Sequence, residues 1–420
     1  MSSAFAYRSS IFHAEAVPVP RIAEAYGTPF YCYARAELHR AYDDLASALQ
    51  ECGALICFAV KANGNLSIIR SFAERGAGAD VVSVGELHRA LAAGVPPEKI
   101  IFSGVGKTRA EIDAALATGI YQFNAESIPE LEVLNAAGAT LGRKIPLALR
   151  VNPDVDPRTH AKISTGRKAT KFGIAVEQTG QALAAVQQLP QLDLCGIAMH
   201  IGSQLTAIQP FDEAFGVMAA LVAEWRAAGH DIRRLDLGGG IGIRYAEETP
   251  PTPAAYAALV KKHFSGLKLQ IAVEPGRFLT GNAGILVSRV IYAKRGGAKN
   301  FLILDAAMND LMRPAMYDSW HDIVPVQAMP GSAVEHWDVV GPVCETSDLF
   351  GQDRALPALQ SGDLVAFMGA GAYGASMAST YNARVLIQEI MADGDLFSLI
   401  RRPVNIEEQI AWDTDPVWVR

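Results

Sequence analysis

The sequence predicts an α/β TIM barrel, (β/α)8, followed by a C-terminal all-β domain. Short apolar segments typical of buried parallel strands alternate with alanine-rich amphipathic segments typical of helices. Eight such pairs fit into about 240 residues, which is the usual size of a closed (β/α)8 barrel. After Glu274 the helical periodicity fades and short apolar strands dominate, which predicts an antiparallel β domain. An open doubly wound sheet is the alternative for the first part, and eight units favour closure.

The elements follow from these patterns. The expected barrel strands are Ile56–Lys61, Ala79–Ser83, Lys99–Ser103, Tyr121–Asn124, Pro146–Val151, Leu194–His200, Arg234–Leu237 and Ile271–Glu274. The clearest helices between them are Ser67–Arg75, Gly85–Ala93, Arg109–Thr118 and Pro210–Ala228. The expected strands of the β domain are Gly284–Ala293, Phe301–Asp305, Ile323–Val326, Asp338–Val340, Leu364–Met368, Arg384–Met391 and Ser398–Arg401.

The N-terminal part is expected to hold a short helix, Pro20–Tyr26, and a strand, Pro29–Tyr33, separated by a Gly-Thr-Pro break. The chain is therefore divided into an N-terminal segment, residues 1–36, whose strand joins the β domain, a barrel, residues 37–280, and the β domain, residues 281–420.

Composition excludes several classes of function. The net charge of −7 gives no basic footprint for nucleic acid. The sequence has no run of about 18 apolar residues, so no transmembrane helix is expected. The N-terminus lacks the pattern of a signal peptide. The five cysteines are scattered without a CxxC pair, which argues against zinc and a disulfide framework and for a reducing cytoplasm. We expect a cytoplasmic protein that uses no metal and binds neither nucleic acid nor membrane.

Lys61 is the first candidate for chemistry. It ends an apolar run and is followed at once by Ala-Asn-Gly, so it lies where the strand stops. Ligands bind at that end of the strands in parallel α/β proteins. A partly desolvated lysine amine can form a Schiff base with an aldehyde cofactor, whereas a lone lysine at a strand end more often extends its amine to solvent.

Two glycine-containing segments follow the seventh and eighth expected strands. Gly238–Gly240 and Gly276 let backbone N–H groups approach an anion closely. Barrels often bind phosphate with these two loops, although tight turns also use glycine. His200 ends the sixth strand, and Arg313 carries the planar fork that binds carboxylates.

Seven segments together resemble the pyridoxal-phosphate-dependent decarboxylases of the alanine-racemase-like fold, and within them the diaminopimelate decarboxylase family. They are FAVKAN around Lys61, MHIGSQ, LGGGIG, EPGR, DAAMNDLMRP, GPVCETSD and the GAGAYG turn. The resemblance runs from about Phe12 to the C-terminus. It implies a carboxy-lyase that converts meso-2,6-diaminopimelate, an amino-acid substrate, to L-lysine and carbon dioxide, the last step of lysine biosynthesis.

The resemblance also implies roles. Lys61 and Cys344 would be catalytic, with the Cys344 thiol returning a proton after decarboxylation. Glu274 would face the pyridine nitrogen and favour a cationic ring, which is the stronger electron sink. The remaining cofactor contacts would be His200, which stacks on the ring, and Ser203, Gly239, Gly240, Gly276, Arg277 and Tyr373, near the phosphate. The substrate contacts would be Arg277, Arg313 and Tyr317 at the distal carboxylate, Glu345 at the distal ammonium, and Tyr373.

Two departures and three alternatives remain. Ala307 stands where the family usually has glycine, and Val385 where relatives often have proline. An ornithine- or arginine-type decarboxylase would keep Lys61 and Cys344 without Glu345 and Arg313. A racemase would lack Glu274, and a non-catalytic cofactor-binding regulator would have lost Lys61 or Cys344. The family further implies a homodimer in which the cysteine loop crosses to the partner, so that active sites are shared.

Overall fold

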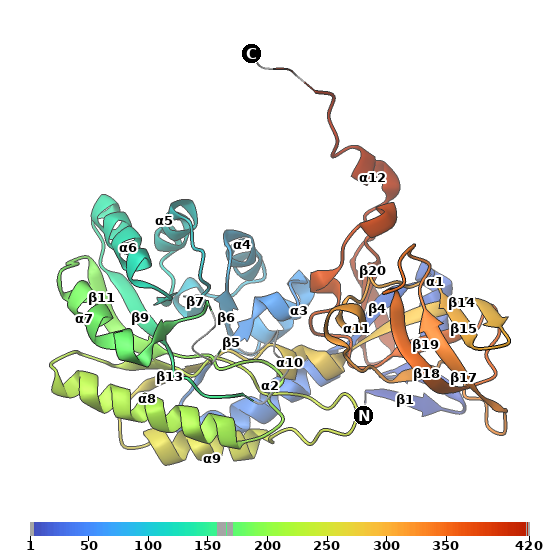
Figure 1. Cartoon of the computed structure of the whole chain (residues 1–420), viewed down its shortest axis with the longest axis horizontal. Helices are drawn as coiled ribbons and strands as arrows, with labels where there is room; N and C mark the ends of the chain where they lie inside the picture. Colours follow the sequence, from blue (N-terminus) through green and yellow to red (C-terminus); the bar gives the residue numbers. More distant parts are fainter. Residues whose placement is uncertain (1–3, 158–164, 166–170, 417, 419–420) are drawn as a thin grey trace. The chain divides into compact units, whose positions relative to one another are not determined.

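The structure is a computed structural model that describes residues 4–157, 165, 171–416 and 418. It divides into two compact units, residues Leu38–Thr280 and a second unit formed by Met1–Glu37 with Gly281–Arg420. The first unit carries the parallel strands and helices labelled from α2 to α10 in Figure 1, and the second carries the strands from β14 onward together with β4.

The first unit is a closed parallel barrel, as predicted. Its eight strands are β5 (Leu55–Ala59), β6 (Gly78–Val81), β7 (Ile100–Phe102), β8 (Gln122–Ala125), β9 (Ile145–Asn152), β11 (Leu192–Ala198), β12 (Arg234–Asp236) and β13 (Gln270–Val273). Each strand pairs in parallel with the next, and β13 returns to pair with β5, which closes the ring. A short strand, β10 (Ile174–Ala175), adds to β9 outside the ring. The alternative of an open sheet is therefore wrong.

Helices surround the barrel and connect its strands (Figure 1). They are α2 (Arg35–Leu49), α3 (Leu66–Ala73), α4 (Val84–Ala92), α5 (Arg109–Thr118), α6 (Ile128–Leu141), α7 (Thr179–Gln187), α8 (Gln209–Ala227), α9 (Pro253–Phe264) and the single turn α10 (Arg277–Thr280). Helix α5 shows why the sequence folds this way. Thr108 and Glu111 form a reciprocal capping box at its start, and Gly119 ends it with φ of 79°, a conformation that glycine adopts without strain.

The second unit is a β domain with two sheets. Its larger sheet has the order β18-β17-β15-β14-β4-β20-β21, and β16 pairs with β19, which pairs with β14. The strands are β4 (Phe30–Ala34), β14 (Gly284–Arg295), β15 (Asn300–Leu304), β16 (Ile323–Pro325), β17 (Val334–Val340), β18 (Leu349–Pro357), β19 (Leu364–Phe367), β20 (Gln388–Asp393) and β21 (Leu396–Arg401). The smaller sheet comprises β1 (Phe5–Arg8), β2 (Ile11–Ala14) and β3 (Val17–Pro18), and the helices are α1 (Val19–Tyr26), α11 (Arg313–Tyr317) and α12 (Ile406–Ile410).

The expectation of a wholly antiparallel domain needs correction. Strand β4 pairs in parallel with β20, and β15 pairs in parallel with β17. The first case arises because β4 comes from the N-terminal end of the chain and inserts between β14 and β20. Such a pairing joins segments more than 300 residues apart, which local sequence patterns do not report.

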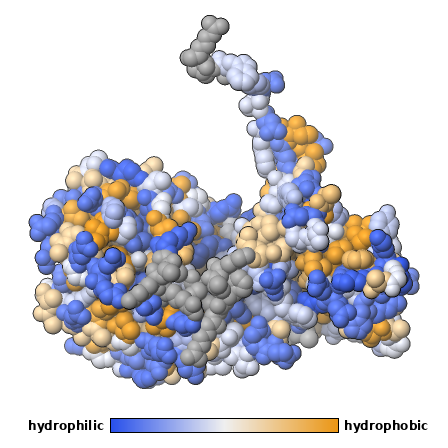
Figure 2. All heavy atoms as spheres, viewed as in Figure 1, coloured by the Kyte–Doolittle hydropathy of each residue, from blue (hydrophilic) through white to orange (hydrophobic). Residues whose placement is uncertain are grey.

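Apolar side chains fill both units, and the surface of each is a mixture of hydrophilic and hydrophobic residues (Figure 2). In the second unit, one core cluster joins residues of β2 and α1 with β4, β14, β19 and β20. Among the described helices, none combines the length and the apolarity needed to cross a bilayer.

Candidate active site

Lys61 lies just past β5 at the C-terminal mouth of the barrel. The strand ends at Ala59, and the lysine belongs to a single 3-10 turn, Val60–Ala62, rather than to the strand as the sequence suggested. Its Nζ lies 2.5 Å from Oδ2 of Asp80, a wholly buried residue of β6, while the lysine side chain keeps 37% of its surface exposed. The amine is therefore held by a carboxylate and still open to a ligand.

Glu274 follows β13, and Asp236 ends β12; both carboxyl groups are buried. Burial raises the pKa of Glu274 well above its usual value, and the charges of Asp236 and Asp80 add to this, while Lys61 opposes it. Burial also raises the pKa of Asp236, against the hydrogen bonds that it accepts. Because two carboxylates cannot both ionise easily in such a place, the pair retains a proton.

A polar layer inside the barrel fixes these carboxyl groups. Asn124 Nδ2 donates to Asp236 Oδ2 (2.7 Å) and lies 3.4 Å from Glu274 Oε1, to which the Ser103 hydroxyl also donates (3.3 Å). Gln122 Nε2 donates to Asn124 Oδ1 (2.9 Å), so the amide of Asn124 is oriented with its N–H groups toward the acids. The layer therefore orients the two carboxyl groups inside the barrel, where burial disfavours their negative charge.

The loop after β12 is shaped by glycine. A Cβ atom on Gly239 would lie 2.2 Å from the Glu274 carbonyl oxygen, and one on Gly240 would lie 2.7 Å from the Gly202 carbonyl oxygen. Gly240 also has φ of 113°, which side chains rarely permit. The loop is joined to the loop after β11, because Leu205 N–H donates to the Gly240 carbonyl (2.9 Å). Glycine at both positions therefore lets the loop pack closely against the segments that follow β11 and β13.

His200 lies two residues beyond the end of β11 and is half-buried. Its Nδ1 accepts the N–H of Gly239 (3.1 Å), which places the proton of a neutral ring on Nε2. Burial lowers the pKa of His200 well below its usual value, and the charges of Arg150 and Lys61 act in the same direction. The ring is therefore a neutral flat surface beside the glycine loop.

Arg277 begins α10 directly after Gly276 and is buried. Its guanidinium donates to the Tyr245 hydroxyl (2.7 Å) and to Ser203 Oγ (3.2 Å). The structure thus brings Ser203 and Arg277 together from the loops after the sixth and eighth barrel strands. Their arrangement supplies a fixed cation and a hydroxyl at the mouth.

Pyridoxal phosphate fits this set of residues. A buried carboxyl pair that holds a proton suits a ring nitrogen that is protonated, since the positive charge would replace that proton. Neither Gly239 nor Gly240 has room for a Cβ, so glycine lets this loop pack closely against the segments after β11 and β13, beside the candidate cofactor residues. In the barrel unit, Lys61, His200, Gly239 and Glu274 interact with one another, and Ser203 pairs with Arg277.

The remaining candidates lie in the β domain. Arg313 and Tyr317 are the first and last residues of α11, and the Arg313 side chain is buried, with 5% of the residue exposed. Tyr373 is half-buried in the turn after β19 and has φ of 55°, a conformation that a tyrosine rarely adopts. Such strain is found most often at ligand sites. Ala307 is buried without a positive φ, so alanine fits where the family usually has glycine.

Cys344 and Glu345 are exposed on the loop between β17 and β18. The loop is anchored by Asp348, whose carboxylate accepts the N–H groups of Met308 and Val343, each at 2.7 Å. The pKa of Glu345 is lowered by hydrogen bonds from the hydroxyls of Ser347 and Tyr381. Both residues are therefore exposed on a loop that Asp348 anchors.

Sequence reasoning missed several residues of these clusters, namely Asp80, Asn124, Asp236 and Asp348. Asp80, Asn124 and Asp236 lie on apolar strands. This was a signal that could have found them, because an acid or amide in a buried strand needs hydrogen-bond partners. The structure places the barrel set and the β-domain set each in its own unit.

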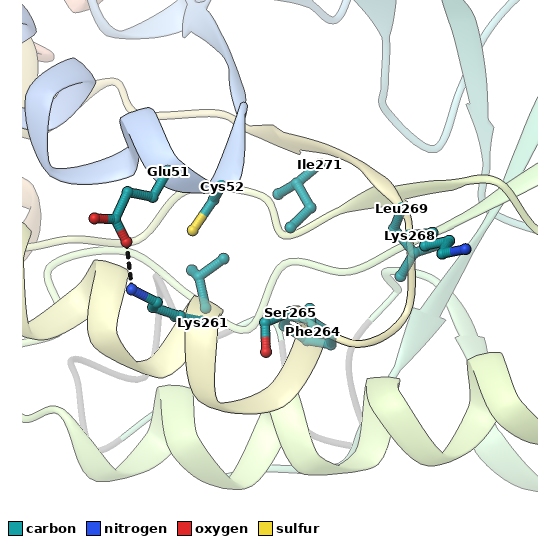
Figure 3. A pocket seen from close by; sticks show the side chains of 9 residues that line it. Glu51, Cys52, Lys261, Phe264, Ser265, Lys268, Leu269 and Ile271 are labelled. Atoms are coloured by element: carbon teal, nitrogen blue, oxygen red, sulfur yellow. Dashed lines mark hydrogen bonds and ion pairs between the residues drawn. The ribbon is translucent and has the colours of Figure 1, made fainter.

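A separate pocket of about 180 Å³ lies at the other end of the barrel (Figure 3). It is lined by residues just before β5, by residues before and at the start of β13, and by the last turns of α9, with the Glu51–Lys261 ion pair at its edge. Lys61 and Glu274 come after these same two strands. The pocket is therefore not the candidate active site.

Comparison with known proteins identifies what this arrangement resembles. The pyridoxal-dependent decarboxylase family, pyridoxal binding domain, matches residues 21–281. The chain is 46% identical over 420 residues to the diaminopimelate decarboxylase of Zymomonas mobilis, covering 99% of both chains. It is 50% identical to that of Neisseria meningitidis serogroup B over 397 residues, covering 94% of this chain and 95% of the relative.

Solved structures agree with these relatives. The diaminopimelate decarboxylase of M. jannaschii in co-complex with L-lysine superimposes with a TM-score of 0.94 at 35% identity, covering 99% of this chain and 98% of the other. That of Helicobacter pylori complexed with L-lysine gives 0.90 at 38% identity, covering 94% and 98%. A lysine/ornithine decarboxylase of Vibrio vulnificus gives 0.79 at 23% identity, over 90% of this chain and 97% of the other, and so shares the fold.

Proposed function

This chain belongs to the pyridoxal-dependent decarboxylase family, and from that premise we propose that it converts meso-2,6-diaminopimelate to L-lysine and carbon dioxide, as a diaminopimelate decarboxylase. The observation that carries the proposal is the barrel mouth itself. There an amine, Lys61 Nζ, is paired with Asp80 within the electrostatic reach of the buried Glu274 carboxyl. This combination suits an aldehyde cofactor with a protonated ring.

Pyridoxal phosphate, when bound, supplies an aldehyde for amines and a ring that accepts the electrons left by departing carbon dioxide. Lys61 supplies the amine that holds the cofactor, and Asp80 orients that amine. Glu274 and Asp236 favour the protonated ring nitrogen, because a buried carboxylate pair stabilises a neighbouring cation. His200 offers a neutral face for stacking.

The other barrel residues bind the anionic end of the cofactor. The loops that hold Gly239, Gly240 and Gly276 would bring backbone N–H groups close to the phosphate, and Ser203 with Arg277 would supply a hydroxyl and a cation. Tyr373, held in its strained turn, completes this contact.

The β domain binds the part of the substrate that does not react. Arg313 and Tyr317, with Arg277, hold the distal carboxylate, since a guanidinium matches a carboxylate with two parallel hydrogen bonds. Glu345 binds the distal ammonium, and Tyr373 contacts the substrate as well as the phosphate. Cys344 carries a proton on Sγ and delivers it to the carbon from which carbon dioxide has left.

Each active site is shared in a homodimer, in which the loop of Cys344 and Glu345 serves the barrel of the partner. Exposure of both side chains on an anchored loop supports this proposal, because a group that meets a second chain must lie at the surface. The protein acts in the cytoplasm, where its five free thiols are compatible with the reducing conditions.

The experiment that tests the cofactor assignment uses borohydride. Protein purified with pyridoxal phosphate is reduced and digested, and the modified peptide is identified by mass spectrometry. Modification of the peptide that contains Lys61, and its loss in Lys61→Ala, is the expected result. Modification of another lysine would remove the basis of the proposal.

A further inference from the structure

His321 is a buried side chain that none of the assigned roles uses. It lies between α11 and β16 and has no exposed surface. Its Nε2 lies 2.9 Å from Nη1 of Arg313, and its Nδ1 lies 2.7 Å from the carbonyl oxygen of Met368 at the end of β19. The imidazole therefore bridges the substrate-binding arginine and the central sheet of the β domain.

The two contacts determine where the imidazole proton is. A guanidinium can only donate, so Nε2 of His321 must accept from Arg313. A carbonyl oxygen can only accept, so Nδ1 must carry the proton and donate to Met368. His321 is thus a neutral ring with one defined tautomer. A protonated ring would instead direct an N–H at the guanidinium and bring two cations together in a buried place.

The support behind His321 is rigid. Arg354 of β18 donates from Nη2 to the His321 carbonyl (3.0 Å), and its guanidinium lies 3.2 Å from the ring centroid of Trp320. Asp322 accepts the N–H of Met368 through its own carbonyl (2.8 Å). The segment from Trp320 to Asp322 is therefore fastened to β18 and β19 on both sides of the histidine.

Ser319 gives Arg313 a second support, because its Oγ accepts from Nη2 (3.2 Å). Together the two acceptors fix the plane of the guanidinium. A guanidinium is planar, so two acceptors on different Nη atoms orient the whole group. Fixing the plane matters for a carboxylate, since paired hydrogen bonds require both groups to be coplanar.

We infer that His321 is a positioning residue that selects substrates with a distal carboxylate, by holding the Arg313 guanidinium in the plane that such a carboxylate requires. The inference rests on the proposed function, because that assigns Arg313 to the distal carboxylate. His321 itself touches no substrate. Its effect is expected on recognition of the carboxylate and not on the reacting centre.

The test measures ligand binding to the holoenzyme by calorimetry. L-Lysine has the distal carboxylate, which is the one that meso-diaminopimelate keeps on decarboxylation. Cadaverine is the same diamine without that carboxylate. Two variants separate the contacts of the ring. His321→Asn keeps a donor near the Nδ1 position, toward Met368, and loses the acceptor for Arg313, while His321→Gln keeps an acceptor near the Nε2 position.

The expected result is that His321→Asn weakens L-lysine binding at least tenfold and cadaverine binding less than twofold, and that His321→Gln regains most of the lost affinity. For meso-diaminopimelate, KM rises while kcat changes little. Ser319→Ala, a smaller change on the same guanidinium, shows the same selectivity to a lesser degree and serves if a histidine variant fails to fold.

Two results would overturn the inference. Unchanged L-lysine binding in folded His321→Asn and in Ser319→Ala shows that these residues do not position Arg313. Equal weakening of both ligands shows a purely structural role. A different failure is possible. If the wild-type protein binds L-lysine no better than cadaverine, the distal-carboxylate site of the proposed function is itself contradicted.

Discussion

Glu274 and Asp236 bring two carboxyl groups into one buried layer, with Asn124 between them. The proton that these two carboxyl groups share is the feature of the site most directly connected to the proposed chemistry. In the cofactor-free protein, burial favours a proton on this pair, and the positive charge of a protonated ring nitrogen can replace that proton. Two measurements on Glu274 follow from this view, one of stability and one of rate.

The first concerns the cofactor-free protein. Because the pKa of Glu274 is raised in the folded state, its contribution to stability is full below the usual glutamate pKa and is lost as the pH rises through the folded value. The free energy of unfolding should therefore fall with rising pH in this window, by at most about 1.4 kcal/mol per pH unit for one proton, and the melting temperature should fall with it. Glu274→Gln should flatten the profile.

Glu247→Gln is the matched control, since the Glu247 side chain is 96% exposed on the same unit. It should leave the pH profile of the melting temperature unchanged. If the profile of Glu274→Gln is as steep as that of the wild type, Glu274 does not hold the proton.

The second measurement is the turnover number of the cofactor-loaded protein. Glu274→Gln should bind pyridoxal phosphate nearly as well as the wild type but lower kcat on the order of 10²-fold or more, because the lost charge acts mainly in the transition state. Steady-state kinetics with a parallel cofactor titration gives both numbers. An unchanged kcat would show that Glu274 does not act on the ring.

At the scale of elements, the loop after β12 and the loop after β17 bring chemical groups to the edges of rigid sheets. Gly239→Ala places a Cβ against the Glu274 carbonyl, which should weaken cofactor binding and destabilise the fold by about 1–3 kcal/mol. Gly266→Ala is the control, because a Cβ there meets nothing within 4 Å. Thermal melts and cofactor titration of both variants test this. Equal effects of the two substitutions would show that the glycine loop is not tightly packed.

Asp348 anchors the Cys344 loop by two backbone hydrogen bonds. Asp348→Ala should release the loop and lower kcat about 10–100-fold, since small displacements of a reacting group have effects of this size. Cofactor affinity should stay the same, because the proposed cofactor-binding residues lie mainly on the barrel. Asp395→Ala, an exposed turn residue of the same unit, should change neither quantity. Wild-type kcat in Asp348→Ala would mean that the loop position does not limit the reaction.

The elements also show how far sequence patterns reach. All eight barrel strands were predicted within a few residues, because parallel strands buried on both faces are continuous apolar runs. Strand β18 was missed because Gln352, Asp353 and Arg354 interrupt its apolar pattern, and β1–β3 are too short to give a signal. Lys61 was predicted at the right end of the right strand, but the 3-10 turn that carries it depends on local geometry.

The candidate site was predictable to the extent that strand ends converge at one mouth. His200, Gly239 and Glu274 follow three different strands, and the structure connects them. The partners that set the charge of these residues, such as Asp80 and Asp236, were not predictable, because their importance depends on distances across the barrel. The roles of Cys344 and Glu345 stay predictions that rest on the resemblance.

At the scale of the whole molecule, the proposed homodimer predicts that two inactive variants can restore activity to each other. Lys61→Ala and Cys344→Ala should each be nearly inactive. Mixed and allowed to exchange subunits, they should recover up to about a quarter of the wild-type activity, because half of the dimers are mixed and each has one intact site. Exchange is verified by native mass spectrometry. A mixture that exchanges but stays inactive would show that Cys344 does not act across a shared site.

The central claim is the choice of substrate, and it is tested most directly by carbon dioxide release from meso-diaminopimelate, ornithine and arginine under the same conditions. The protein should release carbon dioxide from meso-diaminopimelate, form an equal amount of L-lysine, and show a kcat/KM for it at least about 10³-fold above the other two, because they leave Arg313 and Glu345 without their partners. Faster release from ornithine or arginine, or no L-lysine from meso-diaminopimelate, would contradict it.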